Sequence, residues 1–367
     1  MPTSWSKDVF SSSYAEARDR FLESAAQAGA QLTRYEHPRS GPGGEALSTD
    51  VAVLGGSAPR SAAIFNTGAH GVEGFVGSAI AVDAMRSGRL QSRPDDVRVV
   101  FVHALNPYGF AWGRRVDEDN VDVNRNFIEF DGEPPKNEHY DALAEAIAPP
   151  SMTSFTRVRS LARLLAYRAR HGRAAAQAAI SRGQFSHPKG LFFGGQRPSW
   201  SNQTFRSLLR DVGDGIEHIA FVDIHCGLGT RGQAEAIHGY PVASVELQRA
   251  RALWGPLCRN ATEGEASGPA LSGTAKSIVD EVLPHATVTA MTLELGTEPA
   301  LKVLLALQAE NHFHHRDECR SVAGQRARLR LRRVFYPVED ARWRAAVREH
   351  GREVVAATVK HVGEAVG

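Results

Sequence analysis

A buried strand, a glycine-rich turn and a helix follow one another between residues 62 and 85, and this segment constrains the fold most strongly. Residues 62–65 form an apolar run typical of a buried strand, and residues 75–85 repeat apolar side chains with helical period. The turn between them is Asn66-Thr-Gly-Ala-His70-Gly-Val-Glu73-Gly. Its glycines permit a sharp change of direction. We therefore expect His70 and Glu73 beyond a strand end, where open α/β sheets usually bind ligands.

His70 and Glu73 carry two good zinc ligands, an imidazole nitrogen and a carboxylate oxygen. A catalytic zinc site takes three protein ligands and leaves a further position open. A histidine and a glutamate three residues apart are common by chance, so the pair alone is a weak signal. The hypothesis of a metal site requires a third ligand elsewhere in the chain.

A second strand, predicted over residues 219–224, leads directly into His225. Side chains two positions apart in a strand face the same way, so Asp223 and His225 point together. We interpret His225 as the third ligand and Asp223 as the neighbour that orients it. The alternative is a histidine that is satisfied at the sheet edge. Cys226 faces the opposite way, which argues against a nucleophilic role.

Several polar residues would complete a catalytic site. Asn124 and Arg125 form a carboxylate clamp if they face the cleft, because the arginine fork matches a carboxylate. One of Arg114 and Arg115 would polarise a scissile carbonyl and stabilise its oxyanion. For the other arginine we expect the alternative, a solvated charged loop. Glu294 ends a strand predicted over 287–295, where partial burial would raise its pKa and suit a general base.

Weaker candidates have plainer interpretations. Glu294 itself has the alternative of an edge-strand glutamate in solvent, and Glu298 ranks below it because it follows the next glycine turn. His103 is interpreted as a strand histidine. The histidines at 312, 314 and 315 are interpreted as a solvated helix end and not as a second metal site.

The remaining pattern predicts alternating elements of one α/β domain over residues 1–367. Helices are expected over 11–29, 154–181, 202–212, 244–260, 274–283, 299–313 and 340–366, strands over 47–54 and 97–103, and loops over 36–45 and 113–127. The segment from about 130 to 200 is expected to be a helical insertion that covers or flanks the site.

Composition excludes several classes of protein. An apolar fraction of 42% argues against disorder, and a net charge of +2 gives no reason to expect nucleic acid or membrane as partner. Three cysteines without a close pair argue against a disulfide framework. No secretory signal is recognised in residues 1–7, and no apolar window is long enough to span a bilayer. We expect a cytoplasmic protein.

Four motifs together resemble the zinc-carboxypeptidase superfamily, which includes metallocarboxypeptidases and succinylglutamate desuccinylase/aspartoacylase enzymes. In chain order they are His70-x-x-Glu73, Val121-Asp-Val-Asn-Arg-Asn-Phe127, His225 and Leu293-Glu-Leu295. More closely, the chain resembles an uncharacterised bacterial branch known as a domain of unknown function. That likeness extends over nearly the whole length and rests on Ser13-Tyr-x-Glu-Ala-Arg18, Gly68-Ala-His-Gly-Val-Glu-Gly-Phe-x-Gly-Ser78, Ser272-Gly-Thr-Ala-Lys276 and the Tyr336-Pro…Trp343 tail.

The resemblance implies an α/β fold with a mixed, mostly parallel eight-stranded sheet and helices on both faces, as in the phosphorylase/hydrolase-like zinc carboxypeptidases. It implies one Zn²⁺ ion. The implied roles are metal ligands for His70, Glu73 and His225, carbonyl polarisation for Arg115 with Arg114 as the alternative, carboxylate binding for Asn124 and Arg125, and general base and acid for Glu294.

The implied function is a zinc-dependent hydrolase that cleaves an amide bond next to a carboxylate-bearing residue. Its substrate would be a small peptide, as for a carboxypeptidase-like metallopeptidase, or an N-acyl amino acid, as for a deacylase. A third alternative is a non-catalytic zinc-binding protein of this fold. Residues 268–274 lack the mobile tyrosine of the carboxypeptidases. An insertion that roofs the cleft would favour small substrates, and an open groove would favour peptides. The sequence does not decide whether the chain forms a homo-oligomer.

Overall fold

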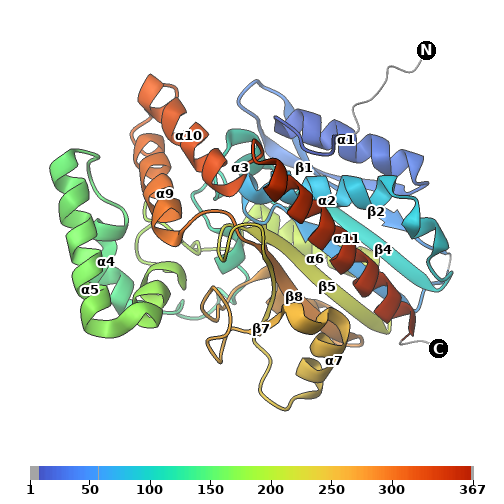
Figure 1. Cartoon of the computed structure of the whole chain (residues 1–367). Helices are drawn as coiled ribbons and strands as arrows, with labels where there is room; N and C mark the ends of the chain where they lie inside the picture. The colour runs from blue at the N-terminus through green and yellow to red at the C-terminus, as the bar shows by residue number, and fades with distance from the viewer. Residues whose placement is uncertain (1–7, 57, 365–367) are drawn as a thin grey trace.

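A sheet of eight strands in the order β1-β2-β4-β3-β5-β8-β6-β7 forms the centre of the structure (Figure 1). The structure is a computed structural model that describes residues 8–56 and 58–364. Strands β3, β4, β5 and β8 run parallel, as do β6 and β7, while β1–β2, β2–β4 and β6–β8 are antiparallel. The predicted mixed, mostly parallel sheet is therefore confirmed. The strands are β1 (Gln31–Ser40), β2 (Ala46–Leu54), β3 (Ser61–Thr67), β4 (Val97–His103), β5 (His218–Cys226), β6 (Ala234–His238), β7 (Cys258–Asn260) and β8 (Thr287–Leu295).

Helices cover both faces of the sheet because the central strands are apolar on both sides. In β3, Ala63 and Phe65 enter one hydrophobic cluster while Ala62 and Ile64 enter the other, as the period of a strand requires. The first cluster is covered by α1 (Tyr14–Gln27), α2 (Gly74–Arg86), α7 (Val245–Trp254) and α11 (Ala341–Glu364), the second by α6 (Trp200–Gly213) and α8 (Val279–Val282). Helices on both faces confirm the second half of the predicted fold class.

Other helices lie to one side of the sheet, where α4 and α5 stand beside α9 and α10 (Figure 1). They are α4 (Glu138–Ile147), α5 (Ser154–Ser181), α9 (Ala300–His314) and α10 (Val322–Phe335). Helix α3 (Pro107–Trp112) instead packs against β1 and β2. The 3₁₀ turns are η1 (Gly71–Glu73), η2 (Arg89–Ser92), η3 (Val123–Arg125), η4 (Gly255–Leu257) and η5 (Ala275–Ile278). Helix α5 has the predicted bounds, but Gly172 (φ 83°, ψ 169°) is non-helical and divides it into two parts.

The predicted elements fail mainly at the sheet edges. The loop predicted over 36–45 is wrong in its first half, because β1 pairs with β2 through Ser40. The helix predicted over 244–260 ends at Trp254, and its last three residues form β7. Strand β1 is mostly exposed, so it lacks the apolar alternation that identifies a strand. The helix predicted over 340–366 is present as α11, and its last two positions lie outside the described residues.

Candidate metal centre and active site

The η1 turn holds His70 and Glu73 in a fixed position at the end of β3. Gly68 adopts φ +68°, and a Cβ on Gly71 would lie 2.0 Å from the carbonyl carbon of Gly109, so both positions need glycine. The backbone N–H of Gly71 also donates to the carbonyl of Arg115 at 3.0 Å. The local sequence therefore places the two predicted ligands side by side, and both are buried.

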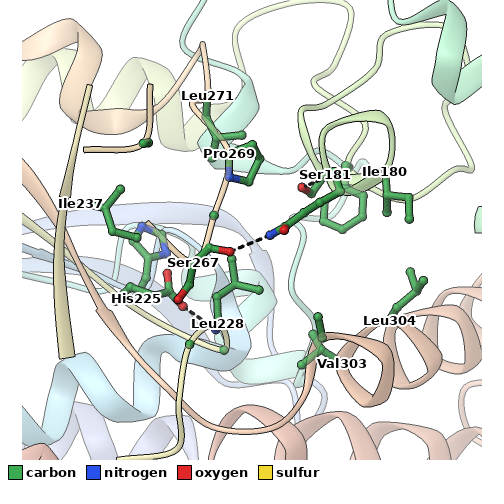
Figure 2. Close-up of a pocket in the computed structure, with 18 of the residues that line it drawn as sticks. Ile180, Ser181, His225, Leu228, Ile237, Ser267, Pro269, Leu271, Val303 and Leu304 are labelled. Atoms are coloured by element: carbon green, nitrogen blue, oxygen red, sulfur yellow. Dashed lines mark hydrogen bonds between the residues drawn. The ribbon is translucent and has the colours of Figure 1, made fainter. Parts of the chain in front are cut away.

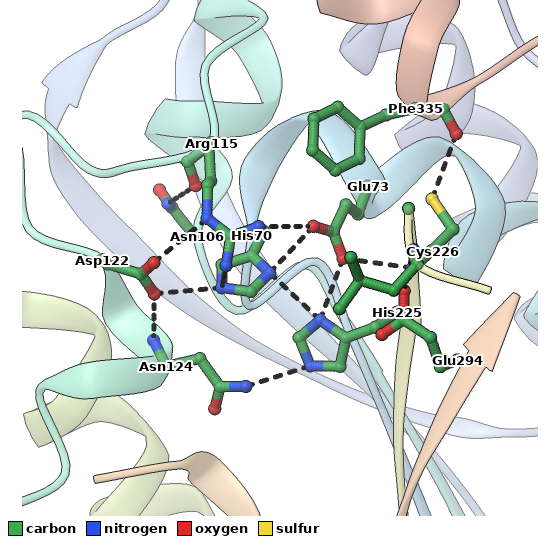
Figure 3. A network of polar contacts seen from close by, with 12 residues as sticks. His70, Glu73, Asn106, Arg115, Asp122, Asn124, His225, Cys226, Glu294 and Phe335 are labelled. Atoms are coloured by element: carbon green, nitrogen blue, oxygen red, sulfur yellow. Dashed lines mark hydrogen bonds and ion pairs between the residues drawn. The ribbon is translucent and has the colours of Figure 1, made fainter. Parts of the chain in front are cut away.

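His225 joins them from the end of β5, which pairs with β3 (Figure 3). His70 Nδ1 lies 2.9 Å from Glu73 Oε1, and His225 Nδ1 lies 2.9 Å from Glu73 Oε2. The two Nδ1 atoms are 3.1 Å apart. Within residues 8–56 and 58–364, His70, Glu73 and His225 are the one group of three or more histidine, cysteine, aspartate or glutamate side chains that could hold a metal ion. Two imidazoles and one carboxylate match the ligand types of a catalytic zinc site.

Each imidazole is supported by a buried carboxylate on its other nitrogen. His225 Nε2 lies 2.8 Å from Asp223 Oδ2, and His70 Nε2 lies 3.0 Å from Asp122 Oδ1. A carboxylate accepts a hydrogen bond from an imidazole that is protonated on Nε2, and this tautomer leaves Nδ1 free for an ion. Arg115 Nη2 also lies 2.7 Å from His70 Nε2. The predicted orientation of Asp223 is confirmed. The sequence by itself predicts no role for Asp122. Its position two residues before Asn124, a predicted site residue, is the sequence feature that could have identified it.

The charges of this group favour a cation between the imidazoles. Burial by itself would raise the pKa of Glu73, but His70 and His225 hold that pKa well below its usual value. Burial would lower the pKa of His225, but Asp223 and Glu73 raise it well above its usual value. The carboxylates therefore stabilise positive charge where the Nδ1 atoms converge, and a divalent ion would supply that charge.

Glu294 lies opposite His225 in the register of β5 and β8, at the wall of the same site. Its Oε1 accepts a hydrogen bond from the backbone N–H of Leu228 at 2.8 Å. Burial, together with the nearby charge of Glu73, raises the pKa of Glu294 to about 8. The alternative interpretation, an edge-strand glutamate in solvent, is thus wrong, because Glu294 is buried. Glu298 is ion-paired with Arg231 at 2.8 Å, outside the group around His225.

Arg114 and Arg115 point to different parts of the molecule. Arg115 donates to Glu73 Oε1 and to Asp122 Oδ2, both at 3.0 Å, and so reaches the candidate metal centre. Arg114 is fully buried and donates to Glu310 Oε1 at 2.8 Å. The expectation of a solvated loop for one of the two is therefore wrong, because Arg114 forms a buried ion pair with α9.

Asn124 and Arg125 both line the cavity at the site. Asn124 Nδ2 lies 3.3 Å from His225 Nε2. Arg125 donates from Nε and Nη2 to the carbonyl of Ser181, at 3.1 and 2.7 Å, and its nearest carboxylate oxygen, on Asp122, is 4.0 Å away. Burial lowers the pKa of Arg125 to about 10. A buried guanidinium without a close carboxylate is suited to an anionic ligand.

The cavity that contains these residues has a volume of about 740 Å³ (Figure 2). The second part of α5 closes over it, and Gln177 Nε2 donates to the carbonyl of Ser267 at 2.7 Å. Lys276, from the Ser-Gly-Thr-Ala-Lys motif, also lines the cavity, and burial lowers its pKa to about 8. The sequence assigned no role to Gln177 or Lys276, and a contact of Gln177 with a residue 90 positions away has no local signal.

The minor candidates lie elsewhere. His103 stacks on Phe21 and faces Ser78, which confirms a strand histidine. Cys226 Sγ donates to the carbonyl of Phe335, away from His225 as predicted. His314 is half-buried and not the solvated side chain expected. Burial lowers its pKa to about 3, and nearby Arg114 adds to the effect. In the described residues, none of the helices has the length and hydropathy that crossing a bilayer requires.

Comparison with known proteins gives one family and several structures. The family model "Protein of unknown function (DUF2817)" matches residues 10–350. A search of the curated proteins found no match. Similar structures include bovine thrombin-activatable fibrinolysis inhibitor in complex with tick carboxypeptidase inhibitor (11% identity, 87% of this chain and 96% of that chain, TM-score 0.45). A metallo-carboxypeptidase from Burkholderia cenocepacia is 13% identical over 95% of this chain and 69% of that chain, with a TM-score of 0.44. An aspartoacylase family protein from Mesorhizobium loti is 15% identical over 73% of this chain and 61% of that chain, with a TM-score of 0.36. Both groups that the sequence resembles, the metallocarboxypeptidases and the aspartoacylase family, thus occur among the similar structures. A similar fold does not assign an activity.

Proposed function

We propose that this chain, which belongs to the DUF2817 family of proteins of unknown function, is a zinc-dependent hydrolase of amide bonds next to a carboxylate-bearing residue. One observation carries the proposal. His70, Glu73 and His225 converge at the wall of a cavity that also contains Glu294 and Arg125. Asp122 and Asp223 contact Nε2 of the two imidazoles, and both Nδ1 atoms face Glu73, as a resident ion would require.

The surrounding side chains would perform distinct steps. A bound zinc ion would supply Lewis acidity, which lowers the pKa of water and polarises a carbonyl. Glu294, with a pKa near neutral pH, would take a proton from water and return it to the leaving amine. Arg115 would stabilise the oxyanion. Asn124 and Arg125 would hold the carboxylate of the substrate, because both line the cavity and Arg125 has no close carboxylate.

Within this function, a carboxypeptidase-like peptidase and an N-acyl amino acid deacylase differ in the space they need. The bond from Gln177 to Ser267 and the contact of Arg125 with Ser181 close the cavity under α5. This roof favours a small N-acyl compound over a long peptide. We also propose that the chain is one catalytic domain in which residues 130–200 are the insertion. A cytoplasmic location is supported by its three unpaired cysteines.

The function is tested with purified protein, measured for zinc content and screened against blocked dipeptides and N-acyl amino acids. Glu294→Gln should retain one zinc ion per chain and lose about 10²- to 10⁴-fold in kcat, the usual contribution of a general base. Glu298→Gln is the matched control, since Glu298 is ion-paired outside the candidate site. Unchanged activity in Glu294→Gln would remove its assigned role. Ligand binding without bound metal would favour the non-catalytic alternative.

A further inference from the structure

We propose that the part of the cavity between α5 and α9 binds an aliphatic acyl chain, so that the substrate is an N-acyl amino acid with a medium or long acyl group. This inference rests on the proposed hydrolase function and assigns its substrate class. In the reaction the acyl C–N bond breaks, and the hydroxyl of water goes to the acyl carbon. The proton of that water passes through Glu294 to the leaving amine, which yields a fatty acid and an amino acid.

The two helices present leucine side chains to the same space. Leu161, Leu164 and Leu165 lie on one face of α5, at the spacing of neighbouring turns. Leu301 and Leu304 line the cavity from α9. Figure 2 shows Leu304 on α9 across from residues at the end of α5, with His225 in the same cavity. The wall is therefore continuous with the candidate metal centre.

The outer part of this wall is exposed, while Leu304 is buried. Leu165 is 51% exposed and Leu301 is 46% exposed. Helix α5 packs against α4 while α9 packs against α10, so the cavity remains between the two pairs. Gly172 is non-helical and divides α5, and at the end of the second part the carbonyl of Ser181 accepts from Arg125. Contiguous apolar side chains beside an active site indicate an apolar ligand.

A hydrocarbon fits this space better than a peptide backbone. The N–H and C=O groups inside a helix bond to one another, so these parts of α5 and α9 offer a ligand only side chains. Leucine side chains carry no donor or acceptor for a peptide main chain. The polar side chains that α5 adds to the lining are Arg168, Arg173, Gln177 and Ser181, which follow the three leucines in the chain. Arg125 and Asn124 supply the polar end of the same cavity. The lining thus suits a molecule with one carboxylate and one long apolar group, and an acetyl group would leave most of about 740 Å³ empty.

The test is a series of N-acyl glycines and N-acyl glutamates with acyl groups of two to twelve carbons, hydrolysed by the zinc-loaded protein. We expect kcat/KM to rise about fourfold per added methylene until the cavity is filled, from the transfer free energy of a buried methylene. Leu165→Gln/Leu301→Gln should lower the ratio of decanoyl to acetyl kcat/KM by about tenfold or more. Both positions are half exposed, so the variant should fold. Leu329→Gln, at an equally exposed leucine on α10 (54%), is the control and should leave the ratio unchanged.

A binding measurement separates this inference from the proposed function. Zinc-loaded Glu294→Gln is titrated calorimetrically with N-decanoyl and N-acetyl glycine. Tighter decanoyl binding that the two leucine substitutions abolish would support the acyl site even if no substrate is hydrolysed. Hydrolysis with no dependence on acyl length, or a preference for extended peptides, would overturn the acyl site and leave the hydrolase standing. Absence of both binding and hydrolysis would overturn both.

Discussion

Replacing Asp223 with asparagine should lower the zinc affinity about ten- to hundredfold, the usual effect of losing a carboxylate behind a ligating histidine. This corresponds to about 1.4–2.7 kcal/mol of binding free energy. Asp223 is fully buried, and its Oδ2 lies 2.8 Å from His225 Nε2. Its other oxygen, Oδ1, accepts from Asn66 Nδ2 at 2.7 Å. The carboxylate therefore serves two donors at once.

An asparagine at this position has one acceptor oxygen and one amino group, so it cannot serve both donors. If its oxygen stays with Asn66, its amino group faces His225 Nε2 and favours the tautomer protonated on Nδ1. That tautomer removes the lone pair proposed to bind the ion. If the amide turns over, the Asn66 donor stays unpaired in a fully buried position, at about 1–3 kcal/mol.

The assay is zinc dissociation measured by competition with a fluorescent chelator at constant pH, with urea unfolding to monitor stability. Asp50→Asn is the matched control, because Asp50 is another buried carboxylate and binds Arg18 and Arg34 in place of a histidine. It should reduce stability and leave the zinc Kd unchanged. A Kd for Asp223→Asn within twofold of wild type would refute the reasoning, as would equal loss of zinc affinity in both variants.

Three further predictions follow from the surrounding residues. Arg125→Lys should raise KM for carboxylate substrates about tenfold or more in steady-state kinetics, because an ammonium cannot reproduce the planar fork; an unchanged KM would contradict the clamp. Arg114→Ala should lower the free energy of unfolding in urea by about 3–5 kcal/mol, since it leaves Glu310 buried and unpaired, and zinc affinity should stay the same. In zinc-stripped protein, stability should fall as pH rises from about 4.5 to about 8, because folded Glu294 keeps a proton that the unfolded chain has lost. Glu294→Gln should reduce that slope in urea unfolding at several pH values, and an identical slope would show that Glu294 does not titrate in this window.

The central fold was predictable because its signals are local. Strands β3, β4, β5 and β8 are apolar runs, and the sequence alone marks them within a residue or two of their observed bounds. Strands β1 and β7 at the two edges of the sheet, and the short β6 beside β7, carry no such signal, since each is defined by the strand with which it pairs. The predicted loop over 36–45 failed for this reason.

The candidate site divides in the same way. Chain spacing alone determined that His70 and Glu73 share one turn and that Asp223 and His225 share one face of a strand, because turn and strand geometry act over a few residues. Tertiary structure decided which of two adjacent arginines reaches the site, since Arg114 is held by a glutamate 196 positions away. It also decided that the two halves of α5, bent at Gly172, enclose a cavity against α9. Contacts between distant segments depend on how whole elements pack, and no local pattern of residues encodes that.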